Sequence, residues 1–228
     1  MSRPFNPDQF DNFVINSSIH KFSLEGKMLS SKRKSHWYLD WEEILNDSYL
    51  TSELTGYIVS FIEENIPETK SIIGVPEGAT PLGILTQYEW ARNHNFARKE
   101  YTFSMFRGKI KEEDYKQSNF VGFPKGKTII IEDSLTTGES LEGAIEKLIR
   151  SKVDVIGGVI LINREQSENN GLGIRKKNNI PYWYMTNAFR ILPKVYEKLN
   201  PGKEVGKKIE KEYEMYGTER SKRIKLVL

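Results

Sequence analysis

The sequence predicts an α/β fold with an open, mostly parallel, twisted sheet flanked by helices. Three largely apolar, β-branched runs carry this prediction: Ser71–Val75, Lys127–Ile131 and Val153–Ile162. Continuous runs of this kind are typical of strands buried on both faces of a parallel sheet. Segments with helical spacing separate the runs, and right-handed crossovers between parallel strands would bring the loops that follow them to one edge of the sheet.

The bulk composition excludes several classes of site. The 228 residues suit one domain with appendages, long enough to bury roughly 70% of the unfolded surface. The chain has no cysteine and three histidines, which excludes a disulfide scaffold and a thiolate metal site and leaves little for zinc. Lys plus Arg number 34 against 31 Asp plus Glu, and a net charge of +3 does not by itself indicate a nucleic-acid partner.

The sequence shows no targeting or membrane-spanning pattern. Met1–Asp8 lacks a charged and apolar leader, and no apolar run approaches the roughly 18 residues of a membrane span. We therefore expect a cytoplasmic protein without a membrane partner.

The N-terminal part is predicted to form two helices with a hairpin between them. Asn6-Pro7-Asp8 is typical of a helix start, and apolar residues follow at helical spacing as far as Ile19. Phe22–Asp40 contains two short extended segments around a basic turn, which on its own indicates a solvated hairpin. Asp47–Asn65 repeats apolar residues on one face and predicts an amphipathic helix that ends near Pro67.

A strand, a loop and a helix come next. Ser71–Val75 leads through the glycine-containing loop Pro76–Pro81 into a helix from about Leu82 to Asn93, and Tyr101–Phe106 is expected to be another strand. The following twenty or so residues, 107–126, show no core face, and loops this long are usually lids or disordered segments. A solvated charged loop is one interpretation, and a polyanion site is the other, formed by Arg107, Lys109, Lys111 and Lys116.

The most informative stretch is Lys127–Ser140. An apolar strand reaches two acids, passes through a hydroxyl-rich loop and enters a helix that begins near Leu141. Backbone N–H groups and hydroxyls at a helix N-terminus form a site for an anion such as phosphate. Glu132 and Asp133, just before the loop, are placed to accept hydrogen bonds from a neighbouring polyol, so the pattern indicates a ribose phosphate. A generic turn between strand and helix is the alternative.

An arginine follows the next buried strand. Val153–Ile162 leads directly into Asn163–Gln166, so Arg164 is expected to face the crevice at the carboxyl ends of the strands. A guanidinium can bind a carboxylate with two parallel hydrogen bonds, and a structural ion pair is the competing interpretation.

The remaining elements are a strand, two helices and a basic tail. Pro181–Met185 predicts a final strand, Ala188–Lys198 a helix, and Gly202–Tyr216 a charged helix with a seam of apolar residues. The tail, 217–225, is basic.

The apolar strand, the two acids and the loop Thr136-Thr137-Gly138-Glu139-Ser140 resemble the phosphoribosyl pyrophosphate (PRPP) motif of type I phosphoribosyltransferases. Over roughly residues 20–190 the chain is most similar to orotate phosphoribosyltransferases. Gly74–Gly83 resembles their pyrophosphate loop, Leu29–Asp40 their N-terminal hood over the base, and Asn163–Gln166 their segment for the orotate carboxylate. The resemblance implies a helix and hood in 1–45, a core in 46–200, and a C-terminal helix with basic tail in 201–228.

The resemblance also implies roles for individual residues. Binding of PRPP is implied for the pyrophosphate loop, the acids and the phosphate loop: Glu77, Gly78, Ala79, Thr80, Glu132, Asp133, Ser134, Leu135, Thr136, Thr137, Gly138, Glu139 and Ser140. Catalysis is implied for Arg107, Lys109, Lys111 and Asp133, and orotate binding for Thr136, Arg164, Trp37, Tyr38 and Ser30. Mg²⁺ would be carried by PRPP without a direct protein ligand. In this family the mobile loop reaches the partner subunit, which implies a homodimer.

Several residues depart from the family pattern, and other functions stay open. The family loop reads Arg-Lys-x-x-Lys-x-His-Gly, whereas residues 107–114 keep Arg107 and Lys111 and lack the His-Gly pair. Ser30 stands where many members have a base-contacting lysine, and Glu139 replaces a small or hydroxyl residue. The alternatives are a phosphoribosyltransferase for another base, which Arg164 opposes, and a PRPP-binding regulator that uses the basic tail on nucleic acid.

Overall fold

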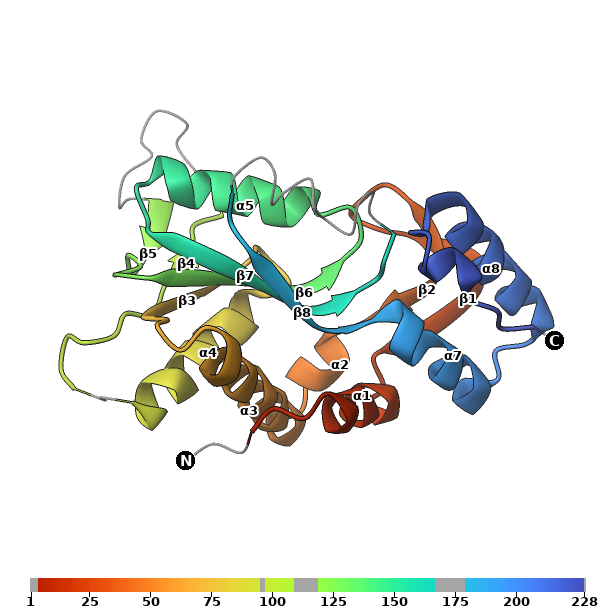
Figure 1. Ribbon diagram of the computed structural model, residues 1–228, viewed down its shortest axis with the longest axis horizontal. Coiled ribbons are helices and arrows are strands. Elements are labelled where there is room, and N and C mark those ends of the chain that lie inside the picture. Colours follow the sequence, from red (N-terminus) through yellow and green to blue (C-terminus); the bar gives the residue numbers. More distant parts are fainter. Residues whose placement is uncertain (1–3, 95–96, 109–118, 167–178, 228) are drawn as a thin grey trace.

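A four-stranded parallel sheet forms the centre of the computed structural model, which describes residues 4–94, 97–108, 119–166 and 179–227 (Figure 1). All three pairs of neighbouring strands are parallel. The predicted α/β class with a parallel sheet flanked by helices is therefore confirmed. In sheet order the strands are β3 (Ser71–Gly74), β6 (Thr128–Leu135), β7 (Val155–Asn163) and β8 (Tyr182–Asn187).

Helices cover both faces of this sheet. The helix α5 (Glu139–Arg150) lies on one face, while α3 (Ser48–Asn65) and α4 (Thr80–Asn93) lie on the other (Figure 1). Successive side chains of β6 point to opposite faces of the sheet. Ile129 and Ile131 pack in the core on the α3 side, whereas Ile130 packs in the core on the α5 side. This two-sided burial explains the continuous apolar run in the sequence.

β6 is longer than the sequence indicated. The chain was expected to turn at the two acids, but pairing with β7 continues to Ser134 opposite Ile162 and Leu135 opposite Asn163. The backbone stays in the ladder because its N–H and C=O groups need partners whatever the side chains are. Glu132 and Asp133 therefore extend from a strand, which holds them more rigidly than a turn would.

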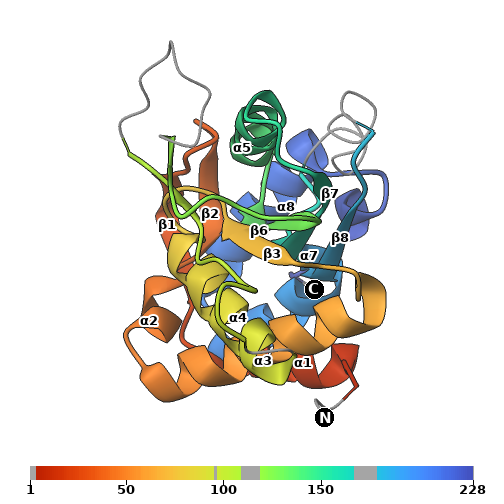
Figure 2. The ribbon, with the colours of Figure 1, turned by 90° about the vertical axis from the view of Figure 1, so that its left-hand side faces the viewer.

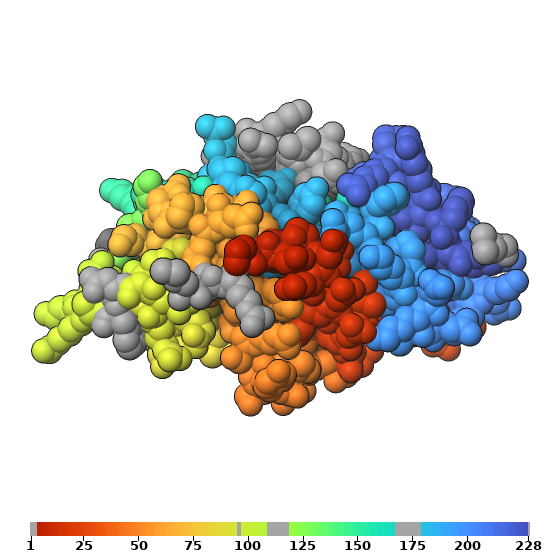
Figure 3. All heavy atoms as spheres, turned by 60° about the horizontal axis from the view of Figure 1, so that its bottom comes forward, coloured from red at the N-terminus to blue at the C-terminus, as the bar shows by residue number. Residues whose placement is uncertain are grey.

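Local signals set the helix starts. Asn6 caps α1 (Pro7–Asn16), and its side chain accepts from the Asp8 and Gln9 nitrogens at 3.0 and 2.9 Å. Asp47 caps α3 in the same way, and the one-turn helix α2 (Glu42–Leu45) before it was not predicted. Figure 3 shows α1 in red between orange and blue surfaces formed by residues near 40–60 and 185–200.

The predicted strand over Tyr101–Phe106 is much shorter and belongs elsewhere. Only Met105–Phe106 (β4) is a strand, and it pairs antiparallel with Phe120–Val121 (β5) in a separate two-stranded sheet. The expected strand is therefore confirmed for Met105–Phe106 alone, and Tyr101–Ser104 are not part of it. The buried ring of Phe120 also gives the end of the long loop a core contact, which the sequence analysis did not identify.

The N-terminal hairpin and the C-terminal helices form one end of the molecule (Figures 1 and 2). The antiparallel strands β1 (His20–Met28) and β2 (Lys34–Leu39) carry a register irregularity between Phe22 and Lys27. This end also contains α7 (Ala188–Leu199), α8 (Lys203–Tyr216) and the 3₁₀ turn η3 (Ser221–Arg223), and α8 contacts both strands of the hairpin. Ser221 and Ile224 are buried, so the basic tail packs against the protein.

None of the helices in the described ranges is long and apolar enough to cross a membrane.

Two glycines bring β3 and α4 into close contact. A Cβ atom at Gly83, on the first turn of α4, would lie 2.3 Å from the Gly74 nitrogen, and a Cβ atom at Gly74 would lie 1.9 Å from the Ala79 carbonyl oxygen. Real Cβ atoms do not approach backbone this closely. The strand, the loop 76–79 and the helix are therefore packed backbone to backbone.

We expect Gly83→Ala to lower the free energy of unfolding by about 1–3 kcal/mol, as overpacking does. The matched control is Gly143→Ala inside α5, where a Cβ atom meets nothing within 4 Å. That substitution should be neutral or stabilise by roughly 0.5–1 kcal/mol, because alanine is the better helix former. Urea unfolding monitored by circular dichroism measures both. Equal free energies for the two variants would contradict the close packing.

Candidate active site

A cleft of about 350 Å³ lies at the carboxyl ends of β3 and β6, under the N-terminal hairpin. Open parallel sheets bind ligands at this edge. The hairpin contributes Ser30 and Tyr38, the loop after β3 contributes Pro76–Gly78, the end of β6 contributes residues 132–140, and Arg164 follows β7. The structure therefore brings together segments that lie far apart in the sequence and that sequence reasoning had assigned to one site.

The loop after β6 leaves backbone donors available at the start of α5. Gly138 is the N-cap, with φ of 91°, a left-handed conformation that favours glycine. No side chain caps this helix, and Thr136, Thr137, Gly138, Glu139 and Ser140 all line the cleft. Uncapped N–H groups at a helix N-terminus, with adjacent hydroxyls, can bind a phosphate group.

Two carboxylates precede this loop. Burial raises the pKa of Glu132 well above its ordinary value, and the charge of Asp133 adds to the effect. Burial also raises the pKa of Asp133 to about 6, against the opposing effect of hydrogen bonds from Ser134. Both carboxyls line the cleft. When ionised, they can accept hydrogen bonds from ligand hydroxyls.

The loop after β3 lies against one of these carboxyls. A Cβ atom at Gly78 would be 2.8 Å from Asp133 Oδ2, so the glycine lets the loop backbone approach the acid. Ala79 and Thr80 are not among the residues that line the main cleft, although Glu77 and Gly78 are. Thr80 instead lines an adjoining cavity.

That adjoining cavity, about 410 Å³, shares Pro76 and Glu77 with the cleft. The start of α4 forms one wall, and Arg107 and Lys147 supply positive charge. The first turn of α4 offers few free donors, because Pro81 has no N–H group and the Thr80 and Gly83 nitrogens donate to the Glu77 and Ala79 carbonyls. Sequence reasoning selected Arg107 and missed Lys147, which is an ordinary solvent-facing lysine in the pattern of α5. Lys109 and Lys111 lie outside the described residues.

Arg164 lines the cleft, but its Nη2 is already engaged, whereas its buried Nε has no hydrogen-bond partner within the described ranges. Nη2 donates to Ser35 Oγ at 2.7 Å and to the Trp37 carbonyl at 2.8 Å, and it lies 3.4 Å from Glu212 Oε1. The side chain is 3% exposed. Sequence reasoning expected the guanidinium to be free for a ligand carboxylate. The structure instead shows the structural ion pair that was the competing interpretation, because the hairpin and α8 close over the arginine.

The expected contact of Trp37 with a ligand is not possible in this geometry. Its ring is fully buried in the core, stacks on His20 and lies 5.1 Å from the Arg164 guanidinium. β2 alternates, so Ser35 and Trp37 point inward. Tyr38 and Ser30 do line the cleft.

Two further residues of this region were missed. Trp41 lines the cleft and donates from Nε1 to Ser134 Oγ at 2.9 Å, which ties the segment after the hairpin to the end of β6. Glu212 on α8 is buried against Arg164. The sequence signal for Glu212 was weak: it lies three residues after Ile209 on the apolar seam of the helix, where a charged side chain is unusual.

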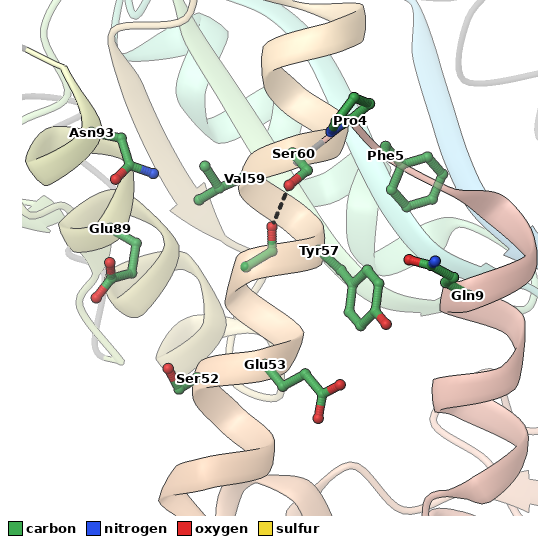
Figure 4. Close-up of a pocket in the computed structure, with 11 residues that line it drawn as sticks. Pro4, Phe5, Gln9, Ser52, Glu53, Tyr57, Val59, Ser60, Glu89 and Asn93 are labelled. Carbon is green, nitrogen blue, oxygen red and sulfur yellow. Dashed lines mark hydrogen bonds between the residues drawn. The ribbon is translucent and has the colours of Figure 1, made fainter. Parts of the chain in front are cut away.

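A third cavity lies away from the strand ends. It also measures about 410 Å³ and lies among the N-terminal segment, α3 and α4, with Phe5, Tyr57 and Glu89 around it (Figure 4). It contains none of the predicted site residues. Cavity volume alone therefore does not identify the functional site.

Within the described ranges, no group of three or more histidine, aspartate or glutamate side chains is arranged to hold a metal ion.

Comparison with known sequences identifies relatives, although no family model matches the chain. The orotate phosphoribosyltransferase of Bradyrhizobium diazoefficiens is 30% identical over 155 residues, which cover 64% of this chain and 77% of that enzyme. The orotate phosphoribosyltransferase of Thermoplasma volcanium is 28% identical over 154 residues, covering 64% and 82%.

Solved structures share the fold. The orotate phosphoribosyltransferase of Francisella tularensis superposes with a TM-score of 0.65 at 21% identity and covers 95% of this chain and 98% of its own. The enzyme of Aeropyrum pernix gives 0.62 at 19% identity, covering 84% and 99%. The sequence and the fold of the chain therefore both match one group of enzymes. The protein is a type I phosphoribosyltransferase, and the chain belongs to the orotate phosphoribosyltransferase family.

Proposed function

We propose that the protein is an orotate phosphoribosyltransferase, which transfers the 5-phosphoribosyl group of PRPP to orotate and forms orotidine 5′-phosphate and pyrophosphate. The observation that carries the proposal is the convergence, in one cleft, of the uncapped helix N-terminus at Gly138, the acid pair Glu132 and Asp133, and Arg164. The family relatives named for this reaction support it.

PRPP would span the cleft and the adjoining cavity. Residues 134–140 would wrap the 5′-phosphate, and Glu132 and Asp133 would accept hydrogen bonds from the ribose hydroxyls. The pyrophosphate would extend over the loop Glu77–Thr80 toward Arg107 and Lys147, since both cavities meet at Pro76 and Glu77. The adjoining cavity suits the pyrophosphate end of PRPP, because Arg107 and Lys147 supply positive charge there.

Orotate would lie between the hairpin and the phosphate loop. Thr136, Ser30 and Tyr38 line that part of the cleft, and Arg164 forms its inner wall. Trp37 would not contact the orotate ring, because its side chain is buried against Arg164. The arginine would supply positive charge and those donors that the hairpin does not use.

The reaction breaks the bond between ribose C1 and a pyrophosphate oxygen and forms a bond between C1 and a ring nitrogen of orotate. Positive charge builds on the ribose in the transition state, where the carboxylate of Asp133 would stabilise it. Arg107, with Lys109 and Lys111 as sequence-based predictions, would stabilise the departing pyrophosphate. The protein would also hold PRPP and orotate so that the ring nitrogen lies close to C1.

Mg²⁺ fits this arrangement as an ion carried by the substrate. Glu132 and Asp133 line the cleft and would accept hydrogen bonds from the ribose hydroxyls, and the resemblance implies that PRPP carries the ion without a direct protein ligand. When bound to PRPP, the ion would neutralise charge on the pyrophosphate. The proposal includes a homodimer, which the resemblance implies, and a cytoplasmic location, which the sequence pattern predicts.

One observation favours a second candidate, a phosphoribosyltransferase for a base without a carboxylate. Arg164 Nη2 has two N–H groups, and Ser35 and Trp37 accept hydrogen bonds from both. A ligand carboxylate could then be held by two parallel hydrogen bonds only after rearrangement. The nucleic-acid regulator loses support, because tail residues make internal contacts, such as Arg220 with Glu165 at 4.0 Å.

We expect Asp133→Asn to weaken PRPP binding by about 10- to 100-fold at pH 8, because an ionised acceptor of the ribose hydroxyls is lost. In the native protein the pKa of Asp133 is about 6, so PRPP affinity should fall as the pH drops below 6 and the carboxyl takes up a proton. Calorimetric titration across pH 5–8 measures this. Asp133→Asn should remove this part of the pH dependence and leave the part that belongs to the substrate phosphate.

The matched control is Asp154→Asn, an exposed aspartate at the other end of the sheet. It should change neither the affinity nor its pH profile. An Asp133→Asn variant that binds PRPP as tightly as the native protein at pH 8 would exclude the assigned contact with the ribose hydroxyls.

We expect Arg164→Ala to raise the KM for orotate on the order of 100-fold while the KM for PRPP changes less than about threefold. The reason is that the Arg164 guanidinium contacts the hairpin and α8, whereas the proposed PRPP contacts lie on the loops after β3 and β6. Steady-state kinetics with each substrate varied in turn measure the difference. The exposed Arg92 provides a control substitution to alanine. Equal increases in the two KM values would show that Arg164 supports the cleft as a whole and does not select the base.

A further inference from the structure

The C-terminal helix places a buried carboxylate beside the base end of the cleft. The side chain of Glu212 is 5% exposed and that of Arg164 is 3% exposed. Glu212 Oε1 accepts from Gln166 Nε2 at 2.7 Å and from Ser35 Oγ at 2.8 Å, and Oε2 accepts from the His36 backbone nitrogen at 3.0 Å. Three contacts from neutral donors therefore fix the carboxylate independently of the arginine.

The arginine is likewise held by neutral groups. Its Nη2 is 2.7 Å from Ser35 Oγ and 2.8 Å from the Trp37 carbonyl, whereas the distance to Glu212 is longer, 3.4 Å. Hydrogen bonds thus set the position of both partners. The ion pair contributes mainly charge, since a carboxylate this close to a buried guanidinium offsets much of its attraction for any other anion.

We propose that Glu212 is a specificity-determining residue: an internal counter-ion of Arg164 that limits how strongly the cleft binds a carboxylated base. This inference rests on the proposed function, because it concerns the same base site. A substrate carboxylate at the cleft wall and the Glu212 carboxylate would share one cation and repel each other. Orotate would then be bound less tightly than an unpaired arginine would allow.

The sign of a substitution follows from this geometry. Glu212→Gln keeps the length of the side chain and one acceptor oxygen while it removes the negative charge. Arg164 stays in place through Ser35 and the Trp37 carbonyl but lacks a counter-ion, so an incoming carboxylate can compensate its charge. A residue that merely positioned Arg164 would give the opposite sign, namely weaker binding of orotate.

The test measures binding of orotate, uracil and PRPP to the native protein and to Glu212→Gln by calorimetry at pH 8. We expect orotate to bind about three- to tenfold more tightly to the variant, with uracil and PRPP changed less than about twofold. Glu214→Gln is the matched control, because Glu214 lies on the exposed side of the same helix with a side chain 59% exposed. Unchanged or weaker orotate binding by Glu212→Gln would overturn the proposal.

A second measurement applies if Glu212→Gln is too unstable for binding studies. The double variant Arg164→Gln/Glu212→Gln removes both charges and should recover most of the lost thermal midpoint, because the instability would come from an unpaired buried cation. Failure to recover it would also overturn the counter-ion role.

The outcomes separate the two proposals. If the native protein turns over orotate but Glu212→Gln does not bind it more tightly, the counter-ion inference fails and the proposed function stands. If the native protein does not turn over orotate but the variant gains affinity for it, the inference stands and the proposed function fails.

Discussion

The burial of β6 on both faces is the constraint on which the rest of the structure depends. Ile129, Ile130 and Ile131 are fully buried between two helical layers, so this strand has one position and one register in the sheet. The buried isoleucines therefore also fix the position of the polar end of β6. Glu132 is held at the floor of the cleft although burial disfavours its charge, and the loop after it must turn immediately into α5 through Gly138. The position of the proposed phosphate site is thus fixed by the core.

A second buried polar cluster connects the ends of the chain to the sheet. Ser35 on β2, Arg164 after β7 and Glu212 on α8 meet in a buried cluster at the wall of the cleft, and Tyr213 adds a hydrogen bond from its hydroxyl to the Arg164 carbonyl at 3.1 Å. Breaking a buried pair by removing one partner is strongly destabilising. The hairpin, the sheet edge and the C-terminal helix therefore form one cooperative unit at the base end of the cleft.

Local physics explains what the sequence predicted well. The run before Glu132, the hydroxyl-rich loop and the caps at Asn6 and Asp47 each depend on residues a few positions apart, and the structure has the predicted elements there. The expected positions of Glu77 and the loop 134–140 around one cleft followed from the rule that parallel strands end at the same edge, whereas those of Ser30 and Tyr38 followed from the family resemblance.

Non-local partners explain what the sequence did not predict. The Arg164 guanidinium contacts Ser35, which lies 129 positions earlier in the chain, and Glu212, which lies 48 positions later. No local sequence pattern specifies either contact. The burial of Trp37 could have been predicted, because side chains alternate along β2 and place Ser35 and Trp37 on one side and Tyr38 on the other. The pairing of Met105–Phe106 with Phe120–Val121 across a long loop had no such signal.

The most direct test of the central claim is the rate of orotate consumption, followed by its ultraviolet absorbance, with purified full-length protein, PRPP and Mg²⁺. The account predicts PRPP-dependent loss of orotate with one pyrophosphate released for each orotate consumed, and loss of this activity in Asp133→Asn. A protein that binds PRPP but neither binds nor consumes orotate would contradict the proposed function, and it would leave the phosphate site to serve another base.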